Sequence, residues 1–123
     1  MEDVKKNNVE ITIYHNTRCS KSRGACEILA EKKVKTKVIE YLNTPPTEKE
    51  LKSLLKKLGM KAEDLIRKSE ELYEKKFSKK KYSETEWIKI MVKNPILIER
   101  PIVVKGEKAI IARPPEKVLE FLK

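Results

Sequence analysis

The sequence predicts an α/β protein with a mixed four-stranded sheet and the element order β-α-β, helical block, β-β-α. Three observations support this: a strand-helix-strand unit over residues 9–41, an all-helical stretch over residues 47–94, and a hairpin followed by a helix over residues 102–122. A βαβ unit gives parallel strands and a hairpin gives antiparallel ones, so the sheet contains both kinds of pairing. The length suits a single domain, residues 1–123, with the helical block as an insertion.

The βαβ unit is predicted from a change of period. Residues 9–14 alternate apolar and polar side chains and are rich in β-branched residues, which is typical of a strand. From Ser20 the apolar residues take helical spacing, and residues 36–41 are again β-prone. We expect the buried face of the helix to carry Cys26, Leu29, Ala30 and Lys33.

The helical block contains two capping boxes, in which a hydroxyl residue is followed three positions later by glutamate. Thr47 with Glu50 opens a leucine-rich helix that stops at Gly59, and Ser83 with Glu86 opens a second helix. One or two short helices are expected between them, around Ala62, Leu65, Ile66, Leu72, Tyr73 and Phe77.

The C-terminal part is predicted to form a hairpin and a last helix. Residues 102–105 and 108–112 are β-prone, and Gly106 opens the two-residue loop between them. Pro114 and Pro115 then start a helix. Its apolar face is expected to carry Val118, Leu119 and Leu122.

Charge and composition narrow the possible partners. The formal charge is +10, from 29 Lys and Arg against 19 Asp and Glu, and it is concentrated only in the segment Lys75–Lys81. Because aromatic residues do not interleave with the basic ones as base stacking requires, we interpret the charge as a lysine-rich surface and expect no nucleic acid partner. No window approaches the roughly 18 apolar residues of a membrane span, and the N-terminal residues do not resemble a secretory signal. We therefore expect a cytoplasmic protein that does not bind membranes.

Cys19 is the candidate nucleophile because it stands where the first strand gives way to a helix. Unpaired backbone N–H groups and the positive end of the helix dipole meet there, and both favour a thiolate. Arg18, Lys21 and Arg23 add positive charge. We expect a pKa below that of a free thiol, and the same amides could hold a tetrahedral oxyanion.

Cys26 and His15 are the other candidates for thiol chemistry. Cys26 is seven residues beyond Cys19, about 10 Å along a helix, so it is either a packed core residue or a resolving thiol that requires local unwinding. Ser22 occupies the second cysteine position of a Cys-x-x-Cys pair, so the partner thiol is expected to come from another molecule. His15 could support the Cys19 loop, and a metal site is not expected because other ligands are missing nearby.

Three arginines stand out in a chain that otherwise prefers lysine. Arg67, Arg100 and Arg113 each adjoin a hydrophobic run in a separate segment. The planar guanidinium group suits bidentate binding of an oxyanion, although a surface salt bridge is the alternative for each one taken alone.

Five segments together resemble the ArsC family of glutaredoxin-coupled arsenate reductases: ITIYHNTRCSKSR, YLNTPPTEKEL, LIRKSEELY, NPILIERPIVV and ARPPEKVLEFL. The resemblance covers nearly the whole chain, and His15, Cys19 and Arg23 match the family's His-x3-Cys-x3-Arg signature. It implies a thioredoxin-like fold and a cis peptide bond between Arg100 and Pro101.

The resemblance also implies roles for individual residues. Cys19 would attack arsenate, and Arg67, Arg100 and Arg113 would bind the anion. Glutathione would act as co-substrate, with no bound cofactor, and glutaredoxin would resolve the mixed disulfide. Two alternatives stay open: a regulator of the related Spx type that binds RNA polymerase, and a glutathione-dependent thiol reductase with another substrate.

Overall fold

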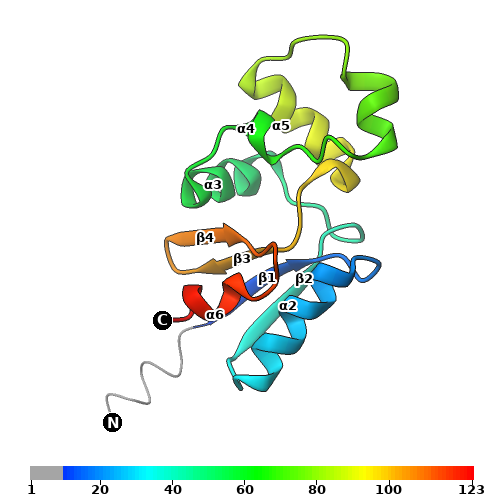
Figure 1. Cartoon of the computed structure of the whole chain (residues 1–123). Coiled ribbons are helices and arrows are strands. Elements are labelled where there is room, and N and C mark those ends of the chain that lie inside the picture. The colour runs from blue at the N-terminus through cyan, green and yellow to red at the C-terminus, as the bar shows by residue number, and fades with distance from the viewer. Residues whose placement is uncertain (1–9) are drawn as a thin grey trace. The chain divides into compact units, whose positions relative to one another are not determined.

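The computed structural model describes residues 10–123, which form two compact units (Figure 1). One unit consists of the described residues up to Tyr41 together with Arg100–Lys123, and the other of Leu42–Glu99. The first carries the sheet and the second is helical. That they act as one domain, residues 1–123, stays a prediction. Within the described range, no helix is both long enough and apolar enough to cross a membrane.

The sheet is mixed and four-stranded, as predicted. Its strands are β1 (Ile11–His15), β2 (Thr36–Glu40), β3 (Ile102–Lys105) and β4 (Lys108–Ile111), in the order β2-β1-β3-β4. The β1–β2 pair is parallel, and the β1–β3 and β3–β4 pairs are antiparallel. Gly106, with φ of 61°, opens the predicted two-residue loop of the hairpin. Val9, the predicted first residue of β1, lies outside the described residues.

Two helices of this unit, α2 (Ser20–Glu31) and α6 (Lys117–Phe121), pack on one face of the sheet. Strands β1 and β3 contribute core residues from the sheet, and helices α2 and α6 contribute the residues that pack against them. The fully buried members are Ile11, Ile13, Ala25, Leu29, Val103, Ala112 and Val118. Because β1 is fixed by this core on one side, its last residue and the following turn have a defined position.

The predicted buried face of α2 is partly wrong. Leu29 is buried as expected, but Ala30 is exposed, and Lys33 lies beyond the end of the helix with φ of 54°. The buried positions are instead Ser22, Ala25 and Leu29, at helical spacings of three and four. Ser22 and Ala25 are small, so the apolar pattern did not reveal the face that they define.

The last helix is also shorter than predicted, and its apolar face is narrower. It begins at Lys117, after Pro114 and Pro115, and has little more than one turn. Val118 is its buried residue, whereas Leu119 is 39% exposed. Leu119 is one position, or about 100° around the helix, from Val118 and so points away from the core. Leu122, the third predicted residue, is partly buried and packs against the core as expected.

The second unit is helical, as predicted. It contains α3 (Glu48–Leu58), α4 (Ala62–Leu65), the π-helix η1 (Tyr73–Phe77), α5 (Glu84–Lys93) and the 3₁₀-helix η2 (Pro95–Leu97). Helix α5 contacts α3, α4 and η2. The buried apolar residues of the unit are Leu51, Leu54, Leu55, Ala62, Leu65, Ile66, Trp87, Ile88, Met91, Leu97 and Ile98.

Both predicted capping boxes are present. Thr47 Oγ1 accepts from the N–H of Glu50 at 3.1 Å, and Glu50 Oε1 accepts from the N–H of Thr47 at 2.9 Å. Ser83 and Glu86 form the same pair at the start of α5. Gly59 ends α3 in the left-handed conformation that glycine adopts at little cost.

Candidate active site

Cys19 is the N-cap residue of α2, directly after the turn that follows β1. Its N–H donates to the carbonyl of Asn16 at 3.0 Å, and its carbonyl accepts the first helical hydrogen bond from Arg23 at 3.0 Å. The residue is partly exposed, and its side chain lies at the start of the helix. A thiolate at Cys19 is therefore at the positive end of the helix dipole and accessible from solvent.

The surroundings lower the pKa of Cys19. Partial burial is the largest single influence and acts against ionisation, but several hydrogen-bond donors outweigh it. These donors are the backbone N–H groups of Ser22 and Lys21 and the side chain of Arg100, whose positive charge also favours the thiolate. The predicted direction of the shift is confirmed, and Arg100 contributes more than the basic residues near Cys19 in sequence.

Ser22 fixes the turn that carries Cys19. Its hydroxyl is completely buried, accepts from the N–H of Asn16 at 2.9 Å and lies 2.6 Å from His15 Nδ1. The amide oxygen of Asn16 accepts from the N–H of Arg18 at 2.9 Å. His15 and Asn16 are also buried, so this small polar network connects the end of β1 to the first turn of α2.

His15 and Cys26 are in contact in the same unit, and Cys26 does not have the surroundings expected of a nucleophile. Cys26 Sγ lies 3.5 Å from His15 Nδ1 and packs against the core of the sheet. Burial, and secondly the carboxylate of Glu27, raise the pKa of Cys26. Burial also lowers the pKa of His15, against the opposite effect of Glu40, so the ring is neutral at pH 7. The contacts of Cys26 are those of a packed thiol.

Arg23, the last residue of the signature, braces the turn rather than the sulfur. Its Nη1 donates to the carbonyl of Thr17 at 2.8 Å, while the side chain stays exposed. This exposed hydrogen bond connects the first turn of α2 to the segment between β1 and α2. Its role is consistent with the predicted supporting function.

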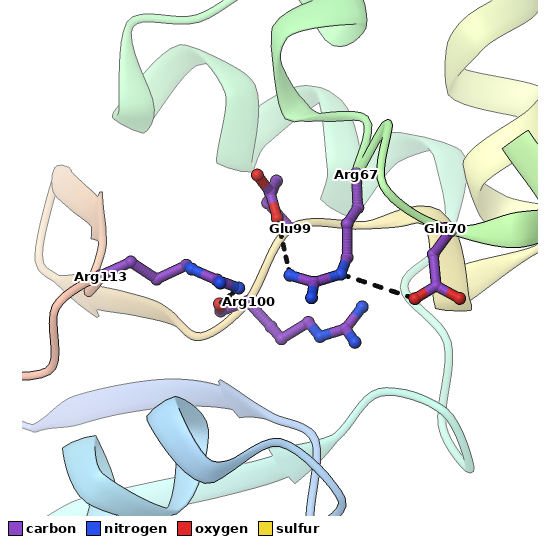
Figure 2. A network of polar contacts seen from close by, with 5 residues as sticks. All are labelled: Arg67, Glu70, Glu99, Arg100 and Arg113. Carbon is purple, nitrogen blue, oxygen red and sulfur yellow. Dashed lines mark hydrogen bonds and ion pairs between the residues drawn. The ribbon is translucent and has the colours of Figure 1, made fainter. Parts of the chain in front are cut away.

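Arg100 and Arg113 belong to the same unit as Cys19. Arg100 is only 7% exposed and precedes β3, and Arg113 follows β4. Arg113 Nη1 donates to the backbone carbonyl of Arg100 at 3.3 Å, so two of the predicted anion-binding arginines are adjacent (Figure 2). The Arg100–Pro101 bond is cis, as implied by the resemblance, and the Arg113–Pro114 bond is also cis.

Arg67 belongs to the helical unit, where two carboxylates hold it (Figure 2). Its Nη1 lies 3.4 Å from Glu99 Oε1, and its Nε lies 3.5 Å from Glu70 Oε2. The backbone of Arg67 is held by an isolated β-bridge between Ile66 and Ile98. At this bridge the N–H of Arg67 donates to the carbonyl of Leu97 at 2.7 Å. The salt-bridge alternative is therefore realised for Arg67.

Sequence reasoning missed Asn16 and Tyr41 at this site and saw Ser22 only as a replaced cysteine. Both missed residues directly follow parallel strands, Asn16 after β1 and Tyr41 after β2, and both are buried. Ligand sites in sheets of this kind gather at the carboxyl ends of parallel strands. Because the two parallel strands were predicted, the rule that ligand sites lie at their carboxyl ends is the signal that could have identified these residues.

The sequence of this chain is similar to those of known proteins. The sequence profile of the ArsC family matches residues 14–121. The chain is 41% identical over 113 residues to the arsenate reductase of Escherichia coli K12, covering 91% of this chain and 80% of that one. It is 49% identical over 115 residues to the uncharacterized protein YfgD of the same organism, covering 92% and 97% of the two chains.

Solved structures show the same relationship. A putative arsenate reductase from Yersinia pestis superposes with a TM-score of 0.85 at 45% identity, covering 89% of this chain and 98% of that one. An arsenate reductase from Vibrio cholerae gives a TM-score of 0.86 at 40% identity, covering 91% and 97%. These neighbours confirm the thioredoxin-like fold. Because the family profile matches most of its length and its relatives share both sequence and fold, this chain belongs to the ArsC family.

Proposed function

We propose that this protein is an oxidoreductase that reduces arsenate to arsenite, with the Cys19 thiolate as nucleophile. The observation that carries the proposal is the pairing of Cys19, at the N-terminus of α2 and with a lowered pKa, with the buried guanidinium of Arg100. A thiolate and a fixed cation at one point are what attack on an oxyanion requires. Relatives about 40% identical carry the name arsenate reductase.

The electron donors are proposed to be glutathione and then glutaredoxin. The only other cysteine in the sequence is Cys26, and burial raises the pKa of its thiol. The helix that separates Cys26 from Cys19 is continuous, with a rise of about 10 Å over seven residues, so the two sulfurs cannot bond without unwinding it. An external thiol therefore supplies the reducing electrons more simply than Cys26 does.

Arsenate is proposed to bind through Arg100, Arg113 and Arg67. Arg100 is supported by its hydrogen bond to Cys19, and Arg113 by its hydrogen bond to the backbone of Arg100. For Arg67 the support is its place in the segment LIRKSEELY, which resembles the family. Replacing each arginine by glutamine should raise the KM for arsenate. Lys68→Gln removes an exposed positive charge next to Arg67 in sequence and is the control for loss of charge alone.

The experiment is an arsenate-reduction assay with glutathione and glutaredoxin on the wild-type chain and on two cysteine variants. We expect turnover by the wild type and by Cys26→Ser, and none by Cys19→Ser. Circular dichroism should show that all three are folded. A wild-type chain that is folded, binds no arsenate and produces no arsenite would refute arsenate as the substrate.

A further inference from the structure

Tyr41 directly follows β2, whose last residue pairs with the last residue of β1, the strand that leads into the Cys19 turn. Strands β1 and β2 pair in parallel with His15 opposite Glu40, so the residues that follow them, Asn16 and Tyr41, leave the sheet side by side. Tyr41 is 1% exposed, which is unusual for a side chain with a hydroxyl unless that hydroxyl has partners.

The partners of the Tyr41 hydroxyl belong to the site. The side chains of Asn16 and Arg100 both hydrogen-bond to it, and both bonds favour the ionised phenol, so both groups act as donors. This assignment fits Asn16, whose amide oxygen already accepts from the N–H of Arg18 at 2.9 Å. The phenol oxygen is thus held between an amide and a guanidinium.

Arg100 connects Tyr41 to the nucleophile. The same side chain that hydrogen-bonds to the phenol also acts as a donor to the sulfur of Cys19. The two acidic groups are close enough for the charge of one to oppose ionisation of the other. An oxyanion bound on Arg100 and attacked by Cys19 would therefore lie next to the Tyr41 hydroxyl.

We propose that Tyr41 is the proton donor to the oxygen that leaves arsenate when the Cys19 thiolate attacks, an assignment that rests on the proposed function. In this step a sulfur–arsenic bond forms and an arsenic–oxygen bond breaks, and arsenic stays pentavalent. The hydroxide that leaves takes the phenol proton and departs as water. Tyr41 becomes a phenolate and then takes the proton of the incoming glutathione thiol. The glutathione thiolate attacks the Cys19 sulfur, so that a disulfide forms, the sulfur–arsenic bond breaks and its electron pair stays on arsenic, which leaves as arsenite.

The surroundings suit both states of Tyr41. Burial, the largest influence, raises the pKa of Tyr41, and the nearby Cys19 acts in the same direction, so the phenol is protonated at pH 7. Arg100 and Asn16 act oppositely and would stabilise the phenolate after proton transfer. Such a donor contributes typically about 100-fold or more to the rate of a step.

The test compares Tyr41→Phe with the wild type and with Tyr82→Phe, a matched loss of a hydroxyl in the helical unit. We expect kcat of Tyr41→Phe to fall about 100-fold, with the KM for arsenate changed less than about threefold. Two further readouts should stay at wild-type values: the pH dependence of Cys19 alkylation and its protection by inorganic phosphate. Tyr82→Phe should retain activity.

Other outcomes would overturn the assignment. Activity of Tyr41→Phe within about threefold of the wild type would show that no proton comes from this residue. A loss accompanied by a higher KM and a higher Cys19 pKa would show that Tyr41 only positions Arg100. A wild-type chain without arsenate turnover would remove the proposed function itself, and this proposal with it.

A ring-fluorinated tyrosine at position 41 provides the rescue test. Fluorine lowers the pKa of the phenol and leaves its hydrogen bonds in place, so activity should be retained. The alkaline limit of kcat should then move to lower pH. An unchanged alkaline limit would contradict proton donation by Tyr41, because a residue that only positions Arg100 would not set that limit.

Discussion

The two cysteines of this chain are seven residues apart, at the start and in the middle of α2, and their surroundings change their acidity in opposite directions. Cys19 lies at the helix N-terminus beside Arg100, and its pKa is lowered. Cys26 lies against the core and near Glu27, and its pKa is raised. The acidity of each thiol is therefore determined by its burial together with the N–H groups and charges around it, and the following variants test that contrast.

The largest expected effect is the loss of activity in Cys19→Ser. Because a hydroxyl at this position is not ionised at pH 7, arsenate reduction should fall by about three orders of magnitude or more. Cys26→Ser keeps the size of the buried side chain and should retain most of the activity. Equal losses in both variants, measured by initial rates, would instead indicate that Cys26 resolves the Cys19 adduct.

Arg100→Gln should make Cys19 resemble Cys26. Removing the guanidinium charge raises the Cys19 pKa, so alkylation by iodoacetamide at pH 7 should slow by about tenfold. In the wild type the pH profile of the alkylation rate should have its midpoint at a lower pH than that of a free thiol. The midpoint of the variant should lie at a higher pH than that of the wild type. Arg100→Lys retains the charge and should lie between them. An unchanged midpoint in Arg100→Gln would exclude Arg100 as a cause of the acidity of Cys19.

Ser22→Ala should loosen the turn between β1 and α2, which carries Cys19. The variant leaves the N–H of Asn16 without its buried acceptor, at a cost of about 1–3 kcal/mol in the free energy of unfolding. Urea denaturation measures this cost, and Ser20→Ala, with its exposed side chain on the same helical turn, is the control. Equal stability of the two variants would show that the polar network at His15 does not hold the turn.

The smallest expected effect is that of Glu27→Gln on Cys26. Removing this carboxylate lowers the Cys26 pKa, so in a Cys19→Ser background alkylation at pH 8 should accelerate by less than about twofold. Glu31→Gln, also exposed on α2, should have no effect. A larger acceleration would mean that charge, rather than burial, keeps Cys26 unreactive.

Local signals in the sequence predicted much of this fold. The capping boxes at Thr47 and Ser83 and the glycine turn at Gly106 act over a few residues, so their structures follow from their spacing. The buried face of α2 did not follow, because Ser22 and Ala25 are small and one of them is polar. What buries them is the close approach of the helix to the sheet, which is a tertiary property.

The candidate site was predictable in part. Cys19 was found from the strand-to-helix turn alone, since that turn brings its own N–H groups. The pairing of Cys19 with Arg100 depends on β1 lying next to β3, a contact between segments about 90 residues apart that no local pattern contains. Asn16 was missed because a polar residue after a strand resembles an ordinary loop, and Tyr41 because the β-prone run over residues 36–41 includes it as an ordinary strand residue.

The most direct test of this account is mass spectrometry of the protein after a single turnover with arsenate and glutathione. Rapid acid quenching and peptide mapping should place one glutathione, added only when arsenate is present, on the peptide that contains Cys19. Cys26 should be recovered as a free thiol. A disulfide between Cys19 and Cys26, or glutathione on Cys26, would contradict the account.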